Sequence, residues 1–318
     1  MNVDVSVVIC AHDNSRWRPL QAAVRSLEDQ HHPPAEIVLV IDHNPLLFER
    51  ARKHFTQATV VENSGPPGLG GARNSGIDVA SGSVVAFLDD DAIASGDWLG
   101  LLVERYSEPD VAGVGGSVEP VWSEGRPRWF PSEFDWVVGC TYRGMPTVAQ
   151  EVRNLMGCNM SLRRELLNRL GRFRLGYGCD ETELCIRLRQ RWPETKLLYV
   201  PEARVFHQVS PTRARLPYLV SRCYFEGGSK AVVSSLVGTE HGLSSEVRYT
   251  REVLPSGVRR GVGEFVRRRD LNGLARAAAI VAGLTSTTAG YLTGRMSTAR
   301  AARRRGWCGG VFPRSGST

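Results

Sequence analysis

The chain of 318 residues contains little lysine and no closely spaced cysteine pair. Only three of its 40 basic residues are lysine, so arginine provides almost all of the positive charge. Its seven cysteines are an odd number and none belongs to a CxxC pair, which argues against a zinc ribbon and a secreted disulfide framework. The opening MNVDVSVVICAHDN has no basic segment ahead of its apolar stretch and does not resemble a signal peptide. We therefore expect a cytoplasmic protein.

Long hydrophobic runs are also missing. The apolar segment 277–292 has 16 uncharged residues, many of them Gly or Thr, whereas a spanning helix needs about 20 apolar residues. It lies in a region, 248–318, whose 14 arginines face three acidic residues, a net charge of +11. Because the whole chain carries +7, the first 247 residues carry −4. This asymmetry favours an anionic membrane surface over nucleic acid as a partner, and the apolar segment fits either a buried or an interfacial helix.

Apolar, strand-like segments alternate with helical ones in the first 110 residues. The strands are expected at 4–11, 36–42, 59–63 and 84–92. Such alternation predicts an α/β fold with a largely parallel sheet and helices on both faces. Ligands of such sheets bind at the carboxyl ends of the strands. Further along, we expect a helix at 180–192, a strand at 196–209 and a helix at 218–238 that is interrupted at Gly227–Gly228.

Three adjacent aspartates, Asp89 to Asp91, directly follow the apolar segment VVAFL. Their carboxylates repel one another unless a cation or hydrogen-bond donors compensate the charge. Mg²⁺ and Mn²⁺ prefer such oxygen ligands, and Mg²⁺ often joins carboxylates to the phosphates of a substrate. The cluster is therefore a candidate metal–diphosphate site, although a surface turn followed by a helix cap would give the same pattern.

Three further motifs have both a functional and a structural interpretation. The glycines of GLGGARNSG (68–76) permit close backbone approach and Arg73 is suited to bind phosphate, but an ordinary helix-entry loop also fits. In CDETEL, Asp180 and Glu181 are candidates for a general base or for compensation of a helix dipole. His207, in a strand-like segment, is either a metal ligand or a structural histidine.

Together these motifs resemble the family-2 glycosyltransferases of the GT-A fold. Six segments within residues 3–210 carry the resemblance, in the family's order and spacing: VSVVICAHDN, EIVLVID, GGARNSGIDVASGSVVAFLDDDA, MGCNMSLRRELL, GCDETELCIRLR and YVPEARVFHQV. The resemblance implies a Rossmann-like nucleotide-sugar-binding fold. It also implies a Mn²⁺- or Mg²⁺-dependent, inverting transfer from a UDP- or GDP-linked sugar to an acceptor hydroxyl or phosphate. A weaker similarity of residues 204–231 to actinobacterial and archaeal lipid-linked-sugar transferases favours an acceptor in lipid-linked or cell-envelope glycan synthesis.

The resemblance implies roles for single residues on the donor side. Asp42 is expected to contact the base of the nucleotide, and Asp89 the ribose. Asp91 and His207 are the implied metal ligands. The full set expected to bind the nucleotide sugar is Ala11, Asp42, Arg73, Asp89 and Asp90.

On the acceptor side the resemblance makes the acidic pair Asp180–Glu181 catalytic. Glu181 is the favoured base, and Asp180 is the alternative because the usual Glu-Asp order of the family is inverted here. Asn159 and Trp136 are expected in the acceptor region.

The expected organisation is a catalytic domain over 1–215, with its nucleotide-binding half ending near 110 and its acceptor half following. A helical, membrane-associating region over 216–300 and a basic, disordered tail over 301–318 complete the chain, which we expect at the inner face of the cell membrane. A nucleotidyltransferase would need glycines and a lysine just after the first strand, where the chain has CAHDNSRW. A catalytically silent nucleotide-sugar-binding module is the other alternative, and the intact acidic pair argues against it.

Overall fold

The computed structural model describes residues 3–176, 178–238 and 244–307. A single sheet of nine strands forms its centre within these ranges. In chain order the strands are β1 (Val5–Ala11), β2 (Glu36–Ile41), β3 (Thr59–Glu62), β4 (Val84–Asp89), β5 (Ala92–Ala94), β6 (Val111–Trp122), β7 (Gln150–Glu151), β8 (Asn159–Arg163) and β9 (Lys196–Val209). Across the sheet their order is β3-β2-β1-β4-β8-β6-β9-β5, and β7 pairs with β9.

The first four neighbouring strands, β3, β2, β1 and β4, all run parallel, and β6 runs parallel to β9. The antiparallel strand β8 joins these two groups by pairing with both β4 and β6. This arrangement confirms the α/β class and the parallel sheet expected for the first 110 residues. It also brings the carboxyl ends of β1, β2 and β4 to one edge.

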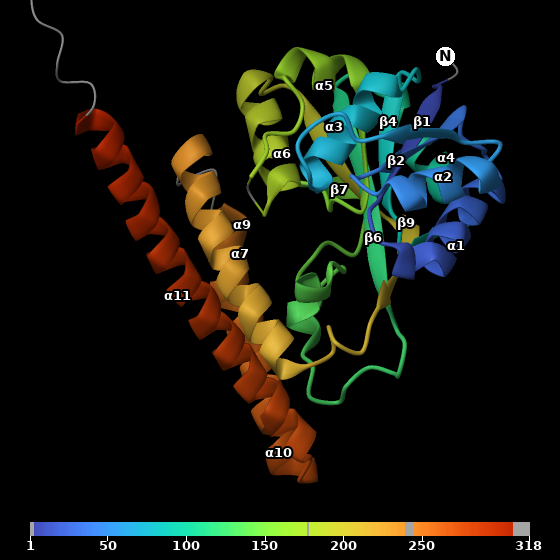
Figure 1. The fold of residues 1–318 in the computed structure, drawn as a ribbon. Helices are drawn as coiled ribbons and strands as arrows, with labels where there is room; N and C mark the ends of the chain where they lie inside the picture. The colour runs from blue at the N-terminus through green and yellow to red at the C-terminus, as the bar shows by residue number, and fades with distance from the viewer. Residues whose placement is uncertain (1–2, 177, 239–243, 308–318) are drawn as a thin grey trace, which may run out of the picture.

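Helices cover both faces of the sheet (Figure 1). Val7 and Ile9 of β1 point to one face and Val8 to the other, as the two-residue period of a strand requires. The helices on the first face are α1 (Trp17–Glu28), α2 (Pro45–His54) and α4 (Trp98–Glu104). Those on the second face are α3 (Leu69–Val79), α5 (Arg164–Leu170) and α6 (Asp180–Arg191).

The C-terminal helices extend away from this three-layer body (Figure 1). They pack on the short helix η3 (Ser132–Val138), which contributes Phe134 and Val137 to a separate apolar cluster. These elements are α7 (Leu216–Val237), α9 (Ser244–Arg248), the π-helical η4 (Tyr249–Val253), α10 (Leu254–Arg268) and α11 (Leu271–Trp307). In the described part of the chain, no helix is both long and apolar enough to cross a membrane.

One sequence expectation for this region is wrong, since α7 runs without a break through Gly227. Glycine is needed there because a side chain would collide with the carbonyl oxygen of Thr287 on α11. Glycine is therefore a packing requirement at this position and not a helix break. In addition, α11 continues to Trp307, so residues 301–307 of the expected disordered tail are helical, and 308–318 lie outside the described residues.

A cluster of partly buried charges ties α7 and α9 to the body that surrounds the sheet. Arg153 makes a two-pronged ion pair with Glu246, at 2.6 and 2.9 Å, and Lys230 Nζ lies 2.9 Å from the same carboxylate. Burial raises the pKa of Glu246, but the charges of Lys230 and Arg153 outweigh this effect and lower the pKa to about 2. The stabilisation is therefore fully present above the ordinary glutamate pKa and is lost as the pH falls toward 2.

We expect Glu246→Gln to lower the free energy of unfolding by about 2 kcal/mol at pH 7, because it leaves two partly buried cations without their shared partner. Urea titration measures this change, and the difference from wild type should shrink as the pH falls from about 4.5. The matched control is Glu252→Gln, which removes an exposed pair with Arg248 and should change stability by less than about 0.5 kcal/mol. An equal loss of unfolding free energy in the two variants would contradict a special stabilising role for Glu246.

Candidate functional site

Three parallel strands end at one cavity of about 430 Å³. Ala11 ends β1, Asp42 follows β2 and Asp89 ends β4, so all three lie at the carboxyl edge of the sheet and line the cavity. Other residues expected from the sequence also line it, namely Asp90, Asp91, Trp136 and His207. The structure therefore brings together most of the expected donor and metal residues, although they come from segments up to about 200 positions apart.

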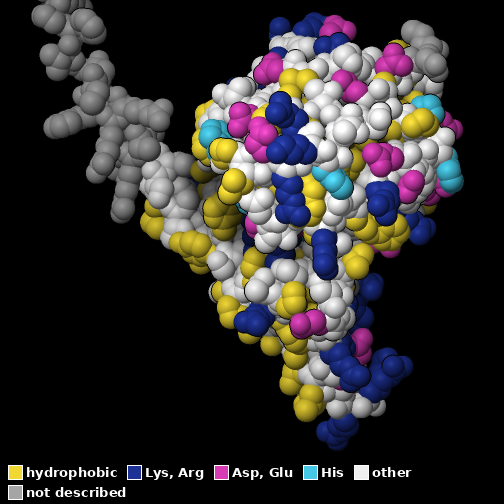
Figure 2. All heavy atoms as spheres, turned by 45° about the vertical axis from the view of Figure 1, so that its right-hand side comes forward, with side chains coloured by type: hydrophobic (Ala, Val, Ile, Leu, Met, Phe, Trp, Pro, Cys, Tyr) yellow, Lys and Arg dark blue, Asp and Glu magenta, His cyan; other side chains and the backbone are white. Residues whose placement is uncertain are grey.

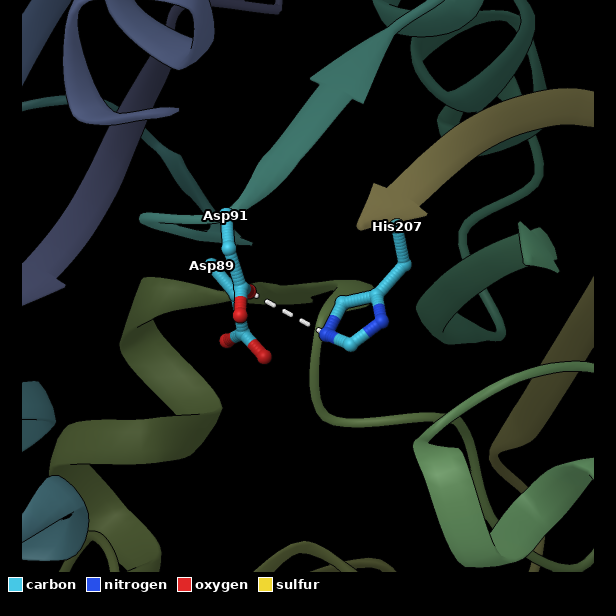
Figure 3. Close-up of side chains that lie close together, drawn as sticks. All are labelled: Asp89, Asp91 and His207. Atoms are coloured by element: carbon cyan, nitrogen blue, oxygen red, sulfur yellow. Dashed lines mark ion pairs between the residues drawn. The ribbon is translucent and has the colours of Figure 1, made fainter. Parts of the chain in front are cut away.

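Asp89, Asp91 and His207 form a compact polar group in the lining of this cavity. One potential ligand atom from each residue lies within 4.8 Å of the others. Figure 3 shows the imidazole of His207 facing both carboxylates, with Nε2 3.1 Å from Asp91 Oδ1. The pairing of β5 with β9 produces this approach, because Ala92 is directly opposite His207 in the register. Carboxylate oxygens with one imidazole nitrogen suit Mn²⁺ or Mg²⁺, so these three residues fit a divalent cation.

The environment keeps Asp91 ionised. Burial raises the pKa of Asp91, but the hydrogen bond from His207 and the charges around it outweigh burial and hold the pKa below the ordinary value. Arg16 Nη1, at 3.2 Å, and Arg213 Nη1, at 3.9 Å, supply much of this positive charge. Asp91 thus presents a charged carboxylate to the cavity although it is only 7% exposed.

Asp90 differs from its neighbours. It is 4% exposed and forms an ion pair of 2.8 Å with Arg16. Burial raises the pKa of Asp90 to about 6, against the opposing effect of Arg16. Asp90 lines the cavity, and its ion pair also fixes the side chain of Arg16, which lies in the short segment before α1.

Asp42 is held by donors from the loop that follows β3. Asn63 Nδ2 donates to Asp42 Oδ1 at 2.6 Å, and the Gly68 N–H donates to Oδ2 at 2.8 Å. Gly68 has φ +118°, a conformation that glycine adopts at little cost. Burial raises the pKa of Asp42, but the hydrogen bonds from Asn63, His43 and Gly68 outweigh burial and lower it. Asp42 is thus a fixed, charged acceptor at the rim of the cavity.

Arg73 crosses from α3 toward Asp89. Its guanidinium lies 3.7 Å from Asp89 and donates to the carbonyl oxygen of Gly157 at 2.7 Å. The rings of Phe87 and Phe173, which pack edge to face on each other, lie 5.7 and 5.5 Å from the guanidinium carbon. These contacts fix a buried positive charge between the aspartates and the start of α6.

The acidic residues in the first turn of α6 differ in burial: Glu183 is buried, whereas Asp180 and Glu181 are half-buried. Glu183 is completely buried and pairs with Arg187 at 2.8 Å and Arg174 at 3.0 Å, which makes it part of the framework. Glu181 is half-buried, and burial raises its pKa above the usual range while the nearby Arg73 opposes this shift. Asp180 lies against α3, where a side chain at Gly70 would come within 2.8 Å of Asp180 Oδ2.

Asn159 is not an acceptor contact, contrary to the sequence expectation. It lies on β8, the strand between β4 and β6, and its side chain is fully buried. Its amide nitrogen donates to the carbonyl oxygens of Ser117 and Ala203, and its oxygen accepts from Trp98 Nε1, so all its polar atoms serve the fold. Trp136, in contrast, lines the cavity and donates from Nε1 to the hydroxyl of Tyr249 at 3.1 Å.

Sequence reasoning missed the positive charge of the cavity. Arg16, Arg213 and Arg222 all line it, together with Tyr218. Arg213 and Arg222 fall within the 204–231 segment, so the weaker similarity of that segment pointed to this region without naming the residues. No sequence pattern pointed to Arg16 as a cavity residue, because its contact with Asp90 joins positions that are 74 residues apart.

The chain has relatives among known proteins. Residues 6–171 match the family model of Glycosyl transferase family 2. The chain is 35% identical over 244 residues to the glucosyl-dolichyl phosphate glucuronosyltransferase of Haloferax volcanii, spanning 73% of this chain and 78% of that protein. It is 33% identical over 177 residues to the succinoglycan biosynthesis protein ExoM of Rhizobium meliloti, spanning 54% of each.

A solved structure shares the fold. The mannosyltransferase PcManGT from Pyrobaculum calidifontis, in complex with GDP-Man and Mn²⁺, is similar with a TM-score of 0.57. The match spans 90% of this chain and 87% of that one at 16% sequence identity. The GT-A fold expected from the sequence is therefore confirmed.

Proposed function

Because the chain belongs to glycosyl transferase family 2, we propose that it moves a sugar from a UDP- or GDP-linked donor to a lipid-linked acceptor, with inversion and with a divalent cation. The observation that carries this proposal is the Asp89–Asp91–His207 group, which lies in a cavity that Asp42 also lines. The name of the Haloferax volcanii relative includes a dolichyl phosphate, which supports the lipid-linked class of acceptor. A role in cell-envelope glycan synthesis follows from such an acceptor, at a peripheral position on the inner face of the membrane.

The donor would lie along the edge of the sheet. Asp42 accepts hydrogen bonds from the base, and Asp89 meets the ribose. The diphosphate then falls near Arg213 and Arg222, whose charges offset its own. Asp91 and His207 would hold Mn²⁺ or Mg²⁺, which stabilises negative charge on the departing diphosphate when bound.

The proposed reaction is a single in-line displacement. The acceptor oxygen attacks the anomeric carbon, its proton passes to the Glu181 carboxylate, and the bond from the sugar to the diphosphate breaks with both electrons leaving on the diphosphate. The raised pKa of Glu181 makes its carboxylate a stronger base than an exposed glutamate. Trp136, at the wall of the cavity that η3 provides, is placed to pack against the acceptor.

A thermal-shift panel tests the donor and the metal together. We expect one nucleoside diphosphate, UDP or GDP, to raise Tm by roughly 5–10 °C at saturation, and only when Mn²⁺ or Mg²⁺ is present. A matching nucleotide sugar should then be consumed with a lipid-phosphate-linked acceptor, as measured by release of the nucleoside diphosphate. Stabilisation without metal, or by no nucleotide, would contradict the proposal. The Asp42→Asn variant should lose most of the nucleotide shift and keep the fold.

A further inference from the structure

Hydrophobic side chains project into solvent along the outer side of α11. Five of them, from Leu274 to Met296, are between 36% and 57% exposed: Leu274, Val281, Leu284, Leu292 and Met296. Figure 2 shows hydrophobic side chains gathered along the edge where these C-terminal helices lie. We call this set the α11 face. It extends over about 33 Å at 1.5 Å per residue.

The α11 face is uncharged over most of its length. Leu274, Val281 and Leu292 fall within one narrow sector of the helix at its 3.6-residue period. Residues 277–294 contain no charged side chain. The exposed threonines between them, Thr285 and Thr288, donate their hydroxyls to the carbonyl oxygens four residues earlier, at 2.9 Å each. Even the polar side chains of this sector are therefore satisfied without water.

A second helix supports the face from behind. The helices α7 and α11 touch at backbone level, since a side chain at Gly227 or Gly290 would collide with a carbonyl oxygen of the other helix. Small residues that allow such close contact are typical of helix pairs in lipid. Along its flank α7 adds exposed Val220 and Tyr224, and the Tyr224 hydroxyl lies 2.9 Å from Thr293 Oγ1. An aromatic ring with one polar end suits the boundary between lipid and water.

Positive charge borders this apolar face at both ends. Arg267, Arg268 and Arg269 are exposed just before α11, and Arg295 is exposed near its far end. Figure 2 shows the basic side chains collected at the tip where α10 leads into α11. No acidic residue occurs between Leu271 and Trp307. An uncharged strip bordered by arginine complements an anionic lipid surface, with acyl chains under the strip and headgroups at the arginines. A second copy of the chain would bring these arginines no acidic partner on α11.

We propose that the α11 face is a membrane-docking surface for anionic phospholipid, on which α11 lies in the plane of the interface. This inference rests on the proposed function, because it explains how the site reaches an acceptor that stays in the membrane. The helix α7 contacts α11 on one side and lines the catalytic cavity with Tyr218 and Arg222 on another. Docking therefore sets the cavity about one helix diameter, roughly 10 Å, from the lipid surface, at the depth of the headgroups.

Co-sedimentation of the full-length protein with vesicles tests this surface without donor, metal or acceptor. We expect the protein to bind vesicles of phosphatidylcholine mixed with phosphatidylglycerol, and the double variant Val281→Asp/Leu292→Asp to bind at least ~10-fold more weakly. The triple variant Arg267→Gln/Arg268→Gln/Arg269→Gln should lose about 10²-fold on these vesicles at low salt, and much less on pure phosphatidylcholine. The matched control is Leu46→Asp, because Leu46 is 79% exposed on α2, far from α11, and should bind as wild type does.

The outcomes separate this surface from the proposed function. Equal vesicle binding by wild type and the double variant, with both folded by circular dichroism, would overturn the docking surface. So would a dimer in gel filtration that the double variant abolishes while no vesicles are bound, since a second copy would then cover the face. Vesicle binding that depends on the α11 face, in a protein that binds no nucleotide, would refute only the glycosyl-transfer proposal.

Discussion

Asp91→Asn is expected to reduce sugar transfer by about 10³-fold while the protein remains folded. The substitution keeps the shape of the side chain and removes a charge that the structure maintains, since the pKa of Asp91 is held below its ordinary value despite burial. Asp91 Oδ1 is also the atom that His207 Nε2 approaches at 3.1 Å, so one change alters two of the three groups that fit a cation. The fold should survive because Arg16 keeps its ion pair of 2.8 Å with Asp90.

Steady-state rates measured over a Mn²⁺ titration, with Tm measured in parallel, test this expectation. Wild type should gain thermal stability with metal and nucleotide together, and Asp91→Asn should gain little. Asp97→Asn is the matched control. Asp97 lies six residues away and is exposed, and its partner, His31, does not line the cavity. Activity of Asp91→Asn within a few-fold of wild type, or an unchanged metal requirement, would remove Asp91 from the metal group.

The acidic lining of the cavity was predictable because its signals are local. Each acidic group there directly follows an apolar strand, and parallel strands place their carboxyl ends at one edge regardless of the loops between them. Asp42 and the Asp89–Asp91 cluster could therefore be assigned to one cavity before any contact was known. The helices on both faces followed from the same alternation of strand and helix.

The positions that could not be predicted depend on long-range packing. Asn159 lies in a recognisable motif, but only the order of the strands shows that β8 lies between β4 and β6. In that position the side-chain amide of Asn159 donates its hydrogen bonds to main-chain carbonyl oxygens. The pair Gly227–Gly228 in α7 predicts a helix break by propensity, and only the contact with Thr287 of α11 explains why glycine is needed at Gly227. Arg16 likewise reaches Asp90 through tertiary structure alone.

Glu181→Gln is expected to lower kcat by about 10²- to 10⁴-fold and to leave binding of the nucleotide nearly unchanged, as the loss of a general base predicts. Within the first turn of α6, the structure favours Glu181 over Glu183 as the base. Glu183 is committed to ion pairs with Arg174 and Arg187, and its replacement should reduce stability before it affects chemistry. Burial raises the pKa of Glu181, which brings its titration closer to neutral pH than that of an exposed glutamate.

The pH dependence of kcat distinguishes a base from a residue that only supports the site. A base must be deprotonated, so wild-type kcat should fall as the pH drops through the raised pKa of Glu181, above the usual glutamate range. In Glu181→Gln this acidic limb should disappear, and the small remaining rate should vary little with pH. Asp180→Asn is the reciprocal variant: if it loses more activity and also removes the acidic limb, Asp180 is the base. A normal limb in Glu181→Gln would show that neither its carboxylate nor its pKa controls proton removal, and the half-buried charge beside Arg73 would then serve only to hold α6 against α3.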